Sequence, residues 1–544
     1  MLLVSCHAST AETSAPIVVA PEDAGSSAKW FDEIASAAGL SFTRVPSEYA
    51  TLQGRMAGGV CLLDVDGNGA IDLFFPGSIS AGGSGSHLYV AHPGAVKLRY
   101  LDEAAARGVD RTGDGGGCLA VDLDGDGRSE LLTTGLGGAH LFRDDGSGKF
   151  TDVSDRLPKV FAADQFLTSA VAFDADGDGD LDLGIATYGK FKHPAAGTKC
   201  IGPCEADISQ YDFGAPSLFL QGNDGVFADA SDRLPRLKEP GLVLLATDLD
   251  EDSKIDLFLG NDVASFPDHY YRGDGMGGFT DVGAELGVRF AASKSGISSM
   301  SSNDPDFDGD GHLDLFESSQ ALDPDGAFRC GVPGGGCVDI SDSLELFRAK
   351  ENYRWGQATV DFDDDGVDEL LEGVGSIQTG GDDDTGILWP TRDTPYFWHR
   401  ESNRGALVLQ PSTGALAAET AGRGVVAADL DGDGDLDVVV GTAQGRPLLL
   451  ENVRAPRGHA LNIVLAGAGK NSRGIGARIT VHVGARVMPA IVHAGSSWMS
   501  SDDGRTHFAL GAATSADSIE VRWPSGKVTN LGSTPADVPL TVRE

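Results

Sequence analysis

Residues 174–182, Asp-Ala-Asp-Gly-Asp-Gly-Asp-Leu-Asp, decide the fold. They place side-chain oxygens at positions 1, 3, 5 and 9 of one tight loop, and the glycine at position 6 lets the backbone turn back on itself. Hard cations such as Ca²⁺ take roughly six to eight oxygen ligands, and a short acidic loop can supply most of them. The stretch is therefore a candidate cation site.

The same spacing occurs seven times, with starts separated by 52 to 74 residues. A period of this size marks a repeat architecture. We number the copies as acidic loops one to seven and predict up to seven Ca²⁺ ions. The candidate ligands, loop by loop, are Asp64, Asp66, Asn68 and Asp72; Asp122, Asp124, Asp126 and Glu130; Asp174, Asp176, Asp178 and Asp182; Asp248, Asp250, Asp252 and Asp256; Asp306, Asp308, Asp310 and Asp314; Asp361, Asp363, Asp365 and Glu369; Asp429, Asp431, Asp433 and Asp437.

The seven loops are not equivalent. Loop four has Ser253 where the others have the position-6 glycine, and we expect it to bind weakly or not at all. Loops two and six carry a longer acid, Glu130 and Glu369, at position 9, and loop one has the neutral Asn68 at position 5.

Two other interpretations of the loops are open. Asp and Gly are common in turns, so a single loop of this kind need not bind an ion. An EF-hand is the second, because Glu317 and Glu372 stand at position 12 of loops five and six. An EF-hand needs amphipathic helices on both sides, whereas flanks such as residues 312–316 alternate like strands.

Four strand-like pieces make up each repeat. One apolar run enters the acidic loop, as at residues 169–173, and a second leaves it, as at 181–186. A third follows, as at 218–221, and a Phe-x-Asp phrase such as 150–152 is the fourth. Four strands in each of seven repeats predict an all-β fold, a seven-bladed β-propeller, with a solenoid as the alternative.

The repeat count predicts how the ring closes. After loop seven only two strands follow, at residues 436–441 and 448–452, while a spare phrase stands at 30–34. We expect that N-terminal phrase to complete the last blade and remove an open sheet edge. For repeat six, the fourth strand is expected at 416–420.

Three regions are predicted. Residues 1–28 form a lipoprotein-like N-terminus and polar tether, residues 29–455 form the propeller, and residues 456–544 form a small β-sandwich-like domain without acidic loops. Its expected strands are residues 461–467, 477–483, 486–493, 507–510 and 518–523.

Charge limits the function classes. The chain has 81 Asp and Glu against 41 Lys and Arg, a net charge of −40, which argues against a nucleic-acid partner. One third of the acids occupy the loop positions, where they would repel one another without cations. No apolar run reaches the length of a transmembrane helix.

The chain has seven cysteines, and the six that follow Cys6 are an even number, which fits an oxidising compartment. Residues 3–6, Leu-Val-Ser-Cys, resemble a lipobox, so Cys6 is a possible lipid anchor of a cell-envelope protein; secretion is the alternative. Disulfides are expected within the pairs 200/204 and 330/337, and less firmly between 61 and 118. Metal ligation by the 200/204 and 330/337 pairs with His193 is the alternative.

The repeat resembles the FG-GAP or VCBS repeat of integrin α-subunit propellers and bacterial surface proteins. Segments 474–478, 507–511 and 521–526 resemble the ASPIC/UnbV domain, although Ala509 departs from its pattern. The two together resemble the cartilage acidic protein family and its bacterial relatives. The resemblance implies a secreted, Ca²⁺-binding propeller, usually without a defined reaction.

We therefore predict an adhesion or interaction scaffold for a glycan or protein partner, without catalytic residues. A glycan-active lyase or hydrolase is the alternative, because propellers include such enzymes. Long insertions at 188–216, 318–337 and 373–404 are expected on the face opposite the cations, where they would bind the partner. Their proposed anchors are Tyr211, Phe213, Trp389, Tyr396, Phe397 and Trp398, with Arg392, His399 and Arg400.

Overall fold

The structure is a computed structural model. It describes residues 29–44, 52–78, 84–92, 98–112, 115–191, 211–263, 265–289, 297–321, 323–332, 335–344, 346, 352–377, 392–455 and 457–544. Within these ranges nearly all regular structure is β, and the α-helices are single turns. They are α1 (Ala35–Ala38), α2 (Leu52–Met56), α3 (Ala104–Arg107) and α4 (Gly283–Leu286).

Seven antiparallel sheets account for the described strands between residues 31 and 452. Sheets one to three are β2 (Cys61–Leu63), β3 (Asp72–Phe75), β4 (His87–Ala91), β5 (Tyr100–Asp102); β6 (Gly116–Val121), β7 (Glu130–Gly135), β8 (Gly138–Asp144), β9 (Phe150–Asp152); and β10 (Gln165–Phe173), β11 (Asp182–Phe191), β13 (Ser217–Gln221), β14 (Phe227–Asp229), with β12 (Tyr211–Phe213) beside β11.

Sheets four to seven follow the same order along the chain. They are β15 (Gly241–Thr247), β16 (Asp256–Asn261), β17 (His269–Gly273), β18 (Phe279–Asp281); β19 (Ser299–Asn303), β20 (Leu315–Ser319), β21 (Gly326–Arg329), β22 (Val338–Asp339); β23 (Arg354–Val360), β24 (Glu369–Val374), β25 (Tyr396–His399), β26 (Val408–Leu409); and β27 (Gly422–Ala428), β28 (Asp437–Thr442), β29 (Leu448–Asn452), β1 (Phe31–Glu33).

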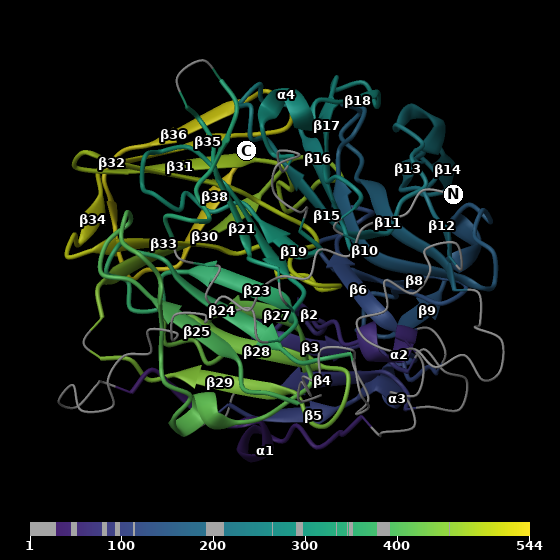
Figure 1. Ribbon diagram of the computed structural model, residues 1–544, viewed down its shortest axis with the longest axis horizontal. Coiled ribbons are helices and arrows are strands. Elements are labelled where there is room, and N and C mark those ends of the chain that lie inside the picture. The colour runs from purple at the N-terminus through teal and green to yellow at the C-terminus, as the bar shows by residue number, and fades with distance from the viewer. Residues whose placement is uncertain are drawn as a thin grey trace, which may run out of the picture.

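The sheets follow one another around the molecule. The first strand of each sheet contacts the first strand of the next, from β2 through β27. Sheet seven returns to sheet one, because Leu62, Val426 and Leu449 share one buried cluster. Figure 1 shows the green strands β28 and β29 beside the purple strands β3 to β5. The all-β prediction is confirmed, and the closed arrangement excludes an open solenoid.

The predicted closure by the N-terminal strand is confirmed. Strand β1 pairs with β29, with Phe31 opposite Asn452, and the Phe31 ring lies 5.3 Å from Phe362 and 5.4 Å from Phe397. The prediction for the fourth strand of sheet six is wrong. That strand is β26, whereas Leu416 ends up buried in the same apolar cluster as Phe31. Leu416 therefore contributes packing and not strand pairing.

The C-terminal part forms two main sheets. One has the order β33-β30-β38 and the other β32-β31-β35-β36, and apolar side chains of both share one buried cluster. All five expected strands are present. The bounds are β30 (His459–Ala466), β31 (Arg478–Val483), β32 (Arg486–Ile491), β33 (Thr506–Gly511), β34 (Ser515–Ala516), β35 (Ser518–Arg522), β36 (Val528–Leu531), β37 (Thr534–Pro535) and β38 (Leu540–Arg543).

A loop of the C-terminal part, residues 493–503, enters the middle of the ring, and we call it the plug. The amide of Cys118 in β6 donates to the carbonyl of Met499 at 3.0 Å, and the amide of Ala172 in β10 donates to the carbonyl of Ala494 at 3.0 Å. Inner strands are sheet edges, whose amides would otherwise need other partners. The plug therefore completes their hydrogen bonding.

Serine hydroxyls of the plug reach three further sheets. Ser497 Oγ accepts from the amides of Gln357 at 3.1 Å and Val425 at 3.2 Å. Ser500 Oγ accepts from the amide of Val60 at 3.1 Å. Sheets one, six and seven are thus hydrogen-bonded to two side chains, Ser497 and Ser500, that belong to the C-terminal part of the sequence.

Aromatic and charged contacts anchor the same loop. Trp498 is fully buried, its Nε1 donates to the carbonyl of Met56 at 2.8 Å, and its ring centroid lies 5.0 Å from that of Trp355. His493 Nε2 lies 2.8 Å from Asp304 Oδ1 of sheet five. The ring and the C-terminal part are therefore packed as one unit.

Two predicted disulfides are present. Cys61–Cys118 links sheets one and two, and Cys330–Cys337 closes a short loop of sheet five. Predictions on Cys6, Cys200 and Cys204 lie outside the described residues.

His269 of β17 is buried between carboxylates. Its Nε2 lies 2.6 Å from Glu239 and its Nδ1 2.7 Å from Asp281, which also pairs with Arg289. Burial lowers the pKa of His269, but its hydrogen bonds to Asp281 and Glu239 outweigh this and raise the pKa to about 9. The imidazolium form thus stabilises sheet four.

Replacing Phe31 by Ala tests the closure. Removing a buried ring from the last sheet should lower the free energy of unfolding by about 3 kcal/mol in urea denaturation. Lys29→Ala, an exposed change two residues away, should have little effect. Equal effects of the two substitutions would contradict a structural role for β1.

A second prediction concerns pH. The folded-state pKa of His269 is raised, so its stabilising contribution is complete below about pH 6.5 and is lost as the pH rises through about 9. His269→Gln should therefore cost on the order of 3 kcal/mol near pH 6 and much less above the folded pKa. His482→Gln, in the C-terminal part, is the control. A cost for His269→Gln that does not vary with pH would contradict this account.

Candidate metal centres

Loop three shows how the position-1 carboxylate is held. Asp174 Oδ1 accepts from the amide of Gly177 at 2.8 Å, and Oδ2 accepts from the amide of Gly179 at 3.1 Å. Both glycines have positive φ, 77° and 90°, which side chains other than glycine rarely adopt. The Gly-rich sequence thus folds the loop around its first acid.

The position-9 carboxylate ties the loop to the sheet. Asp182 Oδ2 accepts from the amide of Ala175 at 2.9 Å, and Oδ1 accepts from the amide of Gln221 in the third strand at 2.7 Å. Asp182 is fully buried. One side chain therefore connects the loop and the first three strands of its sheet.

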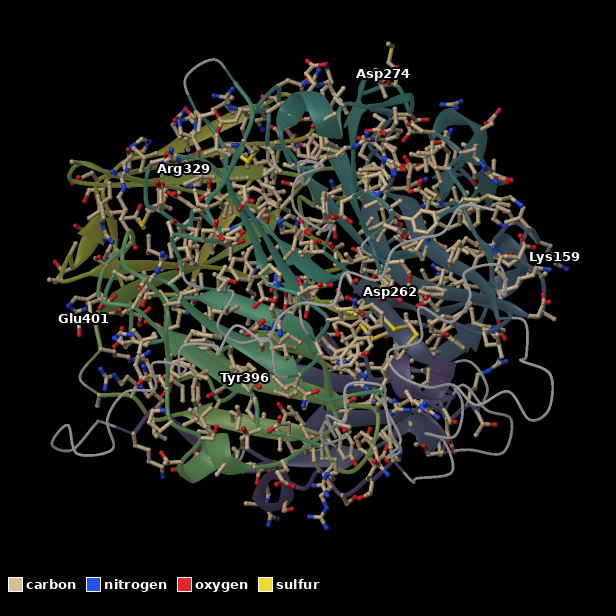
Figure 2. All side chains as sticks on the ribbon, in the orientation of Figure 1. Lys159, Asp262, Asp274, Arg329, Tyr396 and Glu401 are labelled. Atoms are coloured by element: carbon tan, nitrogen blue, oxygen red, sulfur yellow. A yellow bond between two sulfur atoms is a disulfide. The ribbon has the colours of Figure 1, made fainter. Side chains whose placement is uncertain are left out.

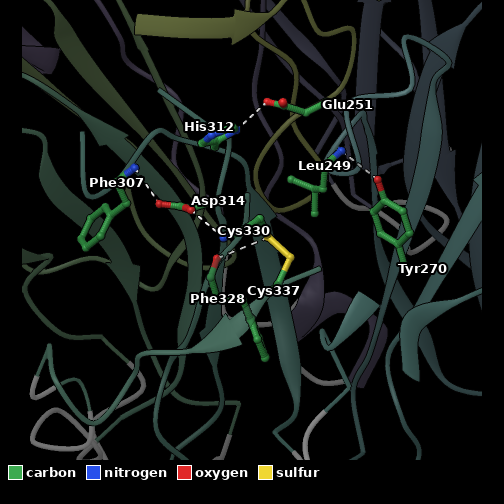
Figure 3. Close-up of a disulfide and its surroundings, with 9 residues drawn as sticks. All are labelled: Leu249, Glu251, Tyr270, Phe307, His312, Asp314, Phe328, Cys330 and Cys337. Carbon is green, nitrogen blue, oxygen red and sulfur yellow. Dashed lines mark hydrogen bonds and ion pairs between the residues drawn. A yellow bond between two sulfur atoms is a disulfide. The ribbon is translucent and has the colours of Figure 1, made fainter. Parts of the chain in front are cut away.

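Figure 3 shows the same arrangement in loop five. Asp314 accepts from the amide of Phe307 at 3.0 Å and from the amide of Cys330 at 2.9 Å. Because Cys330 is bonded to Cys337, the disulfide braces the segment that holds this acid. Neighbouring loops also touch, since His312 Nδ1 lies 3.1 Å from Glu251 Oε1 of loop four.

Carboxylate oxygens converge in the loops. In at least five of them, three side chains each offer an oxygen within 4.8 Å of the others. These groups are Asp64, Asp66 and Asp72; Asp122, Asp124 and Glu130; Asp174, Asp176 and Asp182; Asp248, Asp250 and Asp252; Asp306, Asp308 and Asp314. Positions 1 and 3 are present in every group, and position 9 in four of them.

Several of these oxygens are buried without a hydrogen-bond donor. They are Glu130 Oε1, Asp176 Oδ1, Asp248 Oδ1, Asp256 Oδ2, Asp308 Oδ1 and Asp363 Oδ1. A buried, unpaired carboxylate oxygen is costly unless a cation contacts it. The residues therefore fit a bound metal ion in loops two to six.

Burial also disfavours the charged form of the position-9 acids. It raises the pKa of Asp72 to about 7 and those of Glu130, Asp182, Asp256 and Asp314 to about 8, and the other acids of each loop raise them further. A cation in the loop would reverse this effect by favouring the carboxylate.

Arginines of the ring neutralise part of the charge. Arg143 Nε lies 2.6 Å from Asp124 Oδ2 in loop two, and Arg272 Nε lies 2.5 Å from Asp250 Oδ2 in loop four. In both loops the other oxygen of the position-3 acid accepts the amide of the position-5 residue at 3.3 Å. These pairs leave the buried position-9 oxygens Glu130 Oε1 and Asp256 Oδ2 without a donor.

Loop four adopts the same turn without glycine. Glu251 and Ser253 have φ of 58° and 67°, in the left-handed region, and the amide of Ser253 still donates to Asp248 Oδ2 at 3.1 Å. The strain costs roughly 1 kcal/mol per residue. The predicted weakness of this loop thus has a backbone cause, and its occupancy stays a prediction.

All seven loops join the first two strands of a sheet, which places them on one face and excludes EF-hand flanks in the described residues. The C-terminal part covers this face. Its contacts, loop by loop, are Arg505 to the Gly69 carbonyl, Ser472 to Asp122, Lys470 to Asp180, Arg478 to Glu251, Val487 beside Gly311, His507 to Asp364 and Arg457 to the Asp433 carbonyl.

A cavity of about 780 Å³ lies between this cover and the ring. Asp64, Asp306 and Asp429, the first acids of loops one, five and seven, line it together with His493 and Arg505. These acids thus face a shared interior space, where charges are screened less than at an open surface.

The sequence did not predict this cover. The sequence feature that could have indicated this cover is the charge of residues 457–544. They carry nine Lys and Arg against six Asp and Glu in a strongly acidic chain. Segment 467–473, Gly-Ala-Gly-Lys-Asn-Ser-Arg, supplies two of the contacts.

Four predicted anchors of the partner surface are corrected. Tyr396, Phe397 and Trp398 belong to β25, the third strand of sheet six; Phe397 and Trp398 are buried, and Trp398 Nε1 donates to Glu372 Oε2 at 2.8 Å. Figure 2 labels Tyr396 on this sheet. Arg400 is also buried and donates to backbone carbonyls. The predicted insertion 373–404 therefore contains a strand of the sheet, β25. The predicted insertion 318–337 likewise contains the strand β21.

Three other predicted anchors of the partner surface have described side chains. Phe213 is half-buried, with its ring 5.9 Å from Tyr188 and 5.3 Å from Phe266. Arg392 donates to the carbonyl of Glu419 at 2.7 Å. His399 Nδ1 lies 2.9 Å from Glu369 Oε1. Trp389 and the side chain of Tyr211 lie outside the described part of the chain.

Comparison with known proteins bears out the predicted resemblance. The chain carries FG-GAP repeats, matched at residues 122–185 and 421–452, and an ASPIC and UnbV domain, matched at 467–544. Cartilage acidic protein 1 of Xenopus tropicalis is 25% identical over 516 residues, covering 89% of this chain and 73% of the relative. The protein of that name from Homo sapiens is 24% identical over 522 residues, covering 89% and 71%.

Solved structures are more distant. An Agrocybe aegerita lectin that recognises terminal N-acetylglucosamine gives a TM-score of 0.40 at 14% identity, covering 66% of this chain and 81% of that one. An exotype rhamnogalacturonan lyase gives 0.38 at 14% identity, covering 73% and 72%. Neither likeness is strong enough to bear on function.

Ser253→Gly tests the strain in loop four. Glycine accepts the left-handed backbone, so the variant should unfold at higher urea concentration, with a gain of about 1 kcal/mol. Gly179→Ser is the matched reverse change, at a φ of 90° with no atom near an added Cβ, and should destabilise the protein. Changes of opposite sign in the free energy of unfolding for the two variants support strain in loop four, and changes of the same sign contradict it.

Proposed function

We propose that this protein is an extracytoplasmic calcium-binding scaffold that presents a surface to a glycan or protein partner. The observation that carries the calcium part is the set of buried carboxylate oxygens without hydrogen-bond donors in loops two to six, at position 3 of loops three, five and six and at position 9 of loops two and four. A repeated, costly arrangement of this kind is explained by a repeated ligand.

The donor chemistry supports calcium among the metals. Every candidate ligand is a carboxylate or amide oxygen, with neither imidazole nor thiolate at positions 1, 3, 5 and 9. Oxygen-only sites suit Ca²⁺, Mg²⁺ and Mn²⁺, whereas zinc and copper prefer nitrogen and sulfur. Loops of flexible carboxylates favour Ca²⁺, which accepts more ligands and less regular geometry than Mg²⁺.

The proposed role of the ion is structural. Positions 1 and 9 already organise the loop and the first three strands, as Asp174 and Asp182 do in sheet three. An ion that contacts both would neutralise their charge and hold these strands together. Any ligand that binds only the folded state stabilises it.

The location outside the cytoplasm rests on the disulfides. Cys61–Cys118 and Cys330–Cys337 would persist in an oxidising compartment. The described residues contain no helix that is long and apolar enough to cross a membrane. Secretion and anchoring through a lipid at Cys6 are the two forms of this proposal.

The partner surface is proposed on the face opposite the acidic loops. The C-terminal part covers the loop face, which leaves the other broad face for recognition. Phe213 and Phe266, both half-buried, have ring centroids 5.3 Å apart and lie in segments that join the second and third strands of sheets three and four, as does Asp262, which Figure 2 labels. A glycan array with lyase and hydrolase assays distinguishes binding from turnover. Product release from a polysaccharide would assign the protein to the enzymes instead.

Calcium binding is tested with Asp176→Asn. The substitution keeps the shape of the side chain but removes its charge, so about one Ca²⁺ equivalent should be lost in calorimetry. Calcium at a hundredfold excess over Kd stabilises by about 2.7 kcal/mol per site, so Ca²⁺ should raise the melting temperature less in the variant than in the wild type.

Asp155→Asn, at an exposed residue outside the loops, is the control and should behave like the wild type. A wild-type melting temperature that EDTA does not lower, with no bound Ca²⁺, would exclude calcium as the ligand.

A further inference from the structure

Residues 467–473 of the C-terminal part form a rigid turn, which we call the docking turn. The amide of Gly467 donates to the carbonyl of Ser472 at 2.9 Å. Asn471, which is buried, exchanges two hydrogen bonds with the backbone of Ile475, at 2.7 and 2.8 Å. The turn therefore holds its shape through its own contacts.

The docking turn lies directly on acidic loop two. Ser472 Oγ donates to Asp122 Oδ2, the first carboxylate of that loop. The backbones are in close contact, because a Cβ added to Gly125 would lie 2.6 Å from Lys470 Cα. Asp122 is 1% exposed, whereas Asp126 is exposed, so the turn covers the side of the loop that holds its first carboxylate.

The converging acids of loop two offer one oxygen each, three in all, which is fewer than a full coordination sphere needs. Asp122, Asp124 and Glu130 bring oxygens within 4.8 Å of one another, and buried Glu130 Oε1 has no hydrogen-bond donor. Arg143 occupies Asp124 Oδ2. Calcium takes roughly six to eight oxygens, so a further oxygen beside Asp122 would be a ligand or would orient one.

We propose that Ser472 completes the loop-two cation site, so that one ion is shared between the ring and the C-terminal part. This inference rests on the proposed calcium binding. Among the described residues, loop two is the loop in which a hydroxyl of the C-terminal part hydrogen-bonds to a position-1 carboxylate. The ion then holds the docking turn in place, and the docked turn strengthens ion binding by the same factor.

The neighbouring contact has a different role. Lys470 pairs with Asp180, which occupies position 7 of loop three and is not one of its candidate ligands. That ammonium group neutralises a buried carboxylate and guides the turn to its place. The turn thus has a fixed cationic contact on one loop and a hydroxyl contact on the other.

Ser472→Ala in the full-length protein tests the proposal. Calcium titration calorimetry should show affinity lowered about tenfold at one site, with the other sites unchanged. Hydrogen exchange of residues 467–476 should slow on adding Ca²⁺ in the wild type, and this slowing should be absent in the variant. Ser472→Thr keeps the hydroxyl and should restore both properties.

Ser533→Ala, an exposed serine of the C-terminal part, is the matched control and should match the wild type. Calcium affinity and exchange in Ser472→Ala equal to those of Ser533→Ala would overturn the inference alone. A wild-type protein that binds no Ca²⁺ would overturn the proposed function and the inference with it.

Discussion

The hydrogen bonds of the position-9 carboxylate underlie the rest of the structure. In sheet three, Asp182 accepts one amide from its own loop and one from the third strand. The bond can form only if the loop turns tightly and the third strand returns beside the second. It also buries a negative charge among others, which raises its pKa and creates the need for a cation. The sheet geometry and the proposed ion binding thus depend on the same side chain.

The plug imposes the second constraint, on the ring as a whole. At two positions the plug lies so close to an inner strand that only glycine fits. A Cβ at Gly117 would lie 2.9 Å from Met499 Cβ, and one at Gly424 would lie 2.1 Å from Ser500 Oγ. The plug satisfies amides of several sheets, so the ring is complete only when the last ninety or so residues have docked. Folding therefore depends on contacts between the two ends of the chain.

Local patterns made much of this predictable. The loops, the strands beside them and the clasp at Phe31 follow from residue spacing within a few positions. Strand β25 is not predicted because it is short and follows a long segment rich in Gly and Asp that looks like an insertion, so its aromatic residues resemble surface anchors. The plug and the docking turn could not be predicted, since their partners, such as Val60 for Ser500, are hundreds of residues away. Only the basic charge of the C-terminal part hinted at its position.

The proposed Ca²⁺ would be a second kind of cation at the acidic loops, beside the arginines, and the shapes of the two differ. A guanidinium group is broad and reaches the loop from the rim, as Arg143 does at Asp124 and Arg272 does at Asp250. It cannot enter the space beside the position-9 acid without displacing packed strands. Glu130 Oε1 therefore has no donor although an arginine lies close by. A bare ion is small enough for that place. The side chains of the C-terminal part neutralise the rim, and the proposed ion would occupy the centre of the loop.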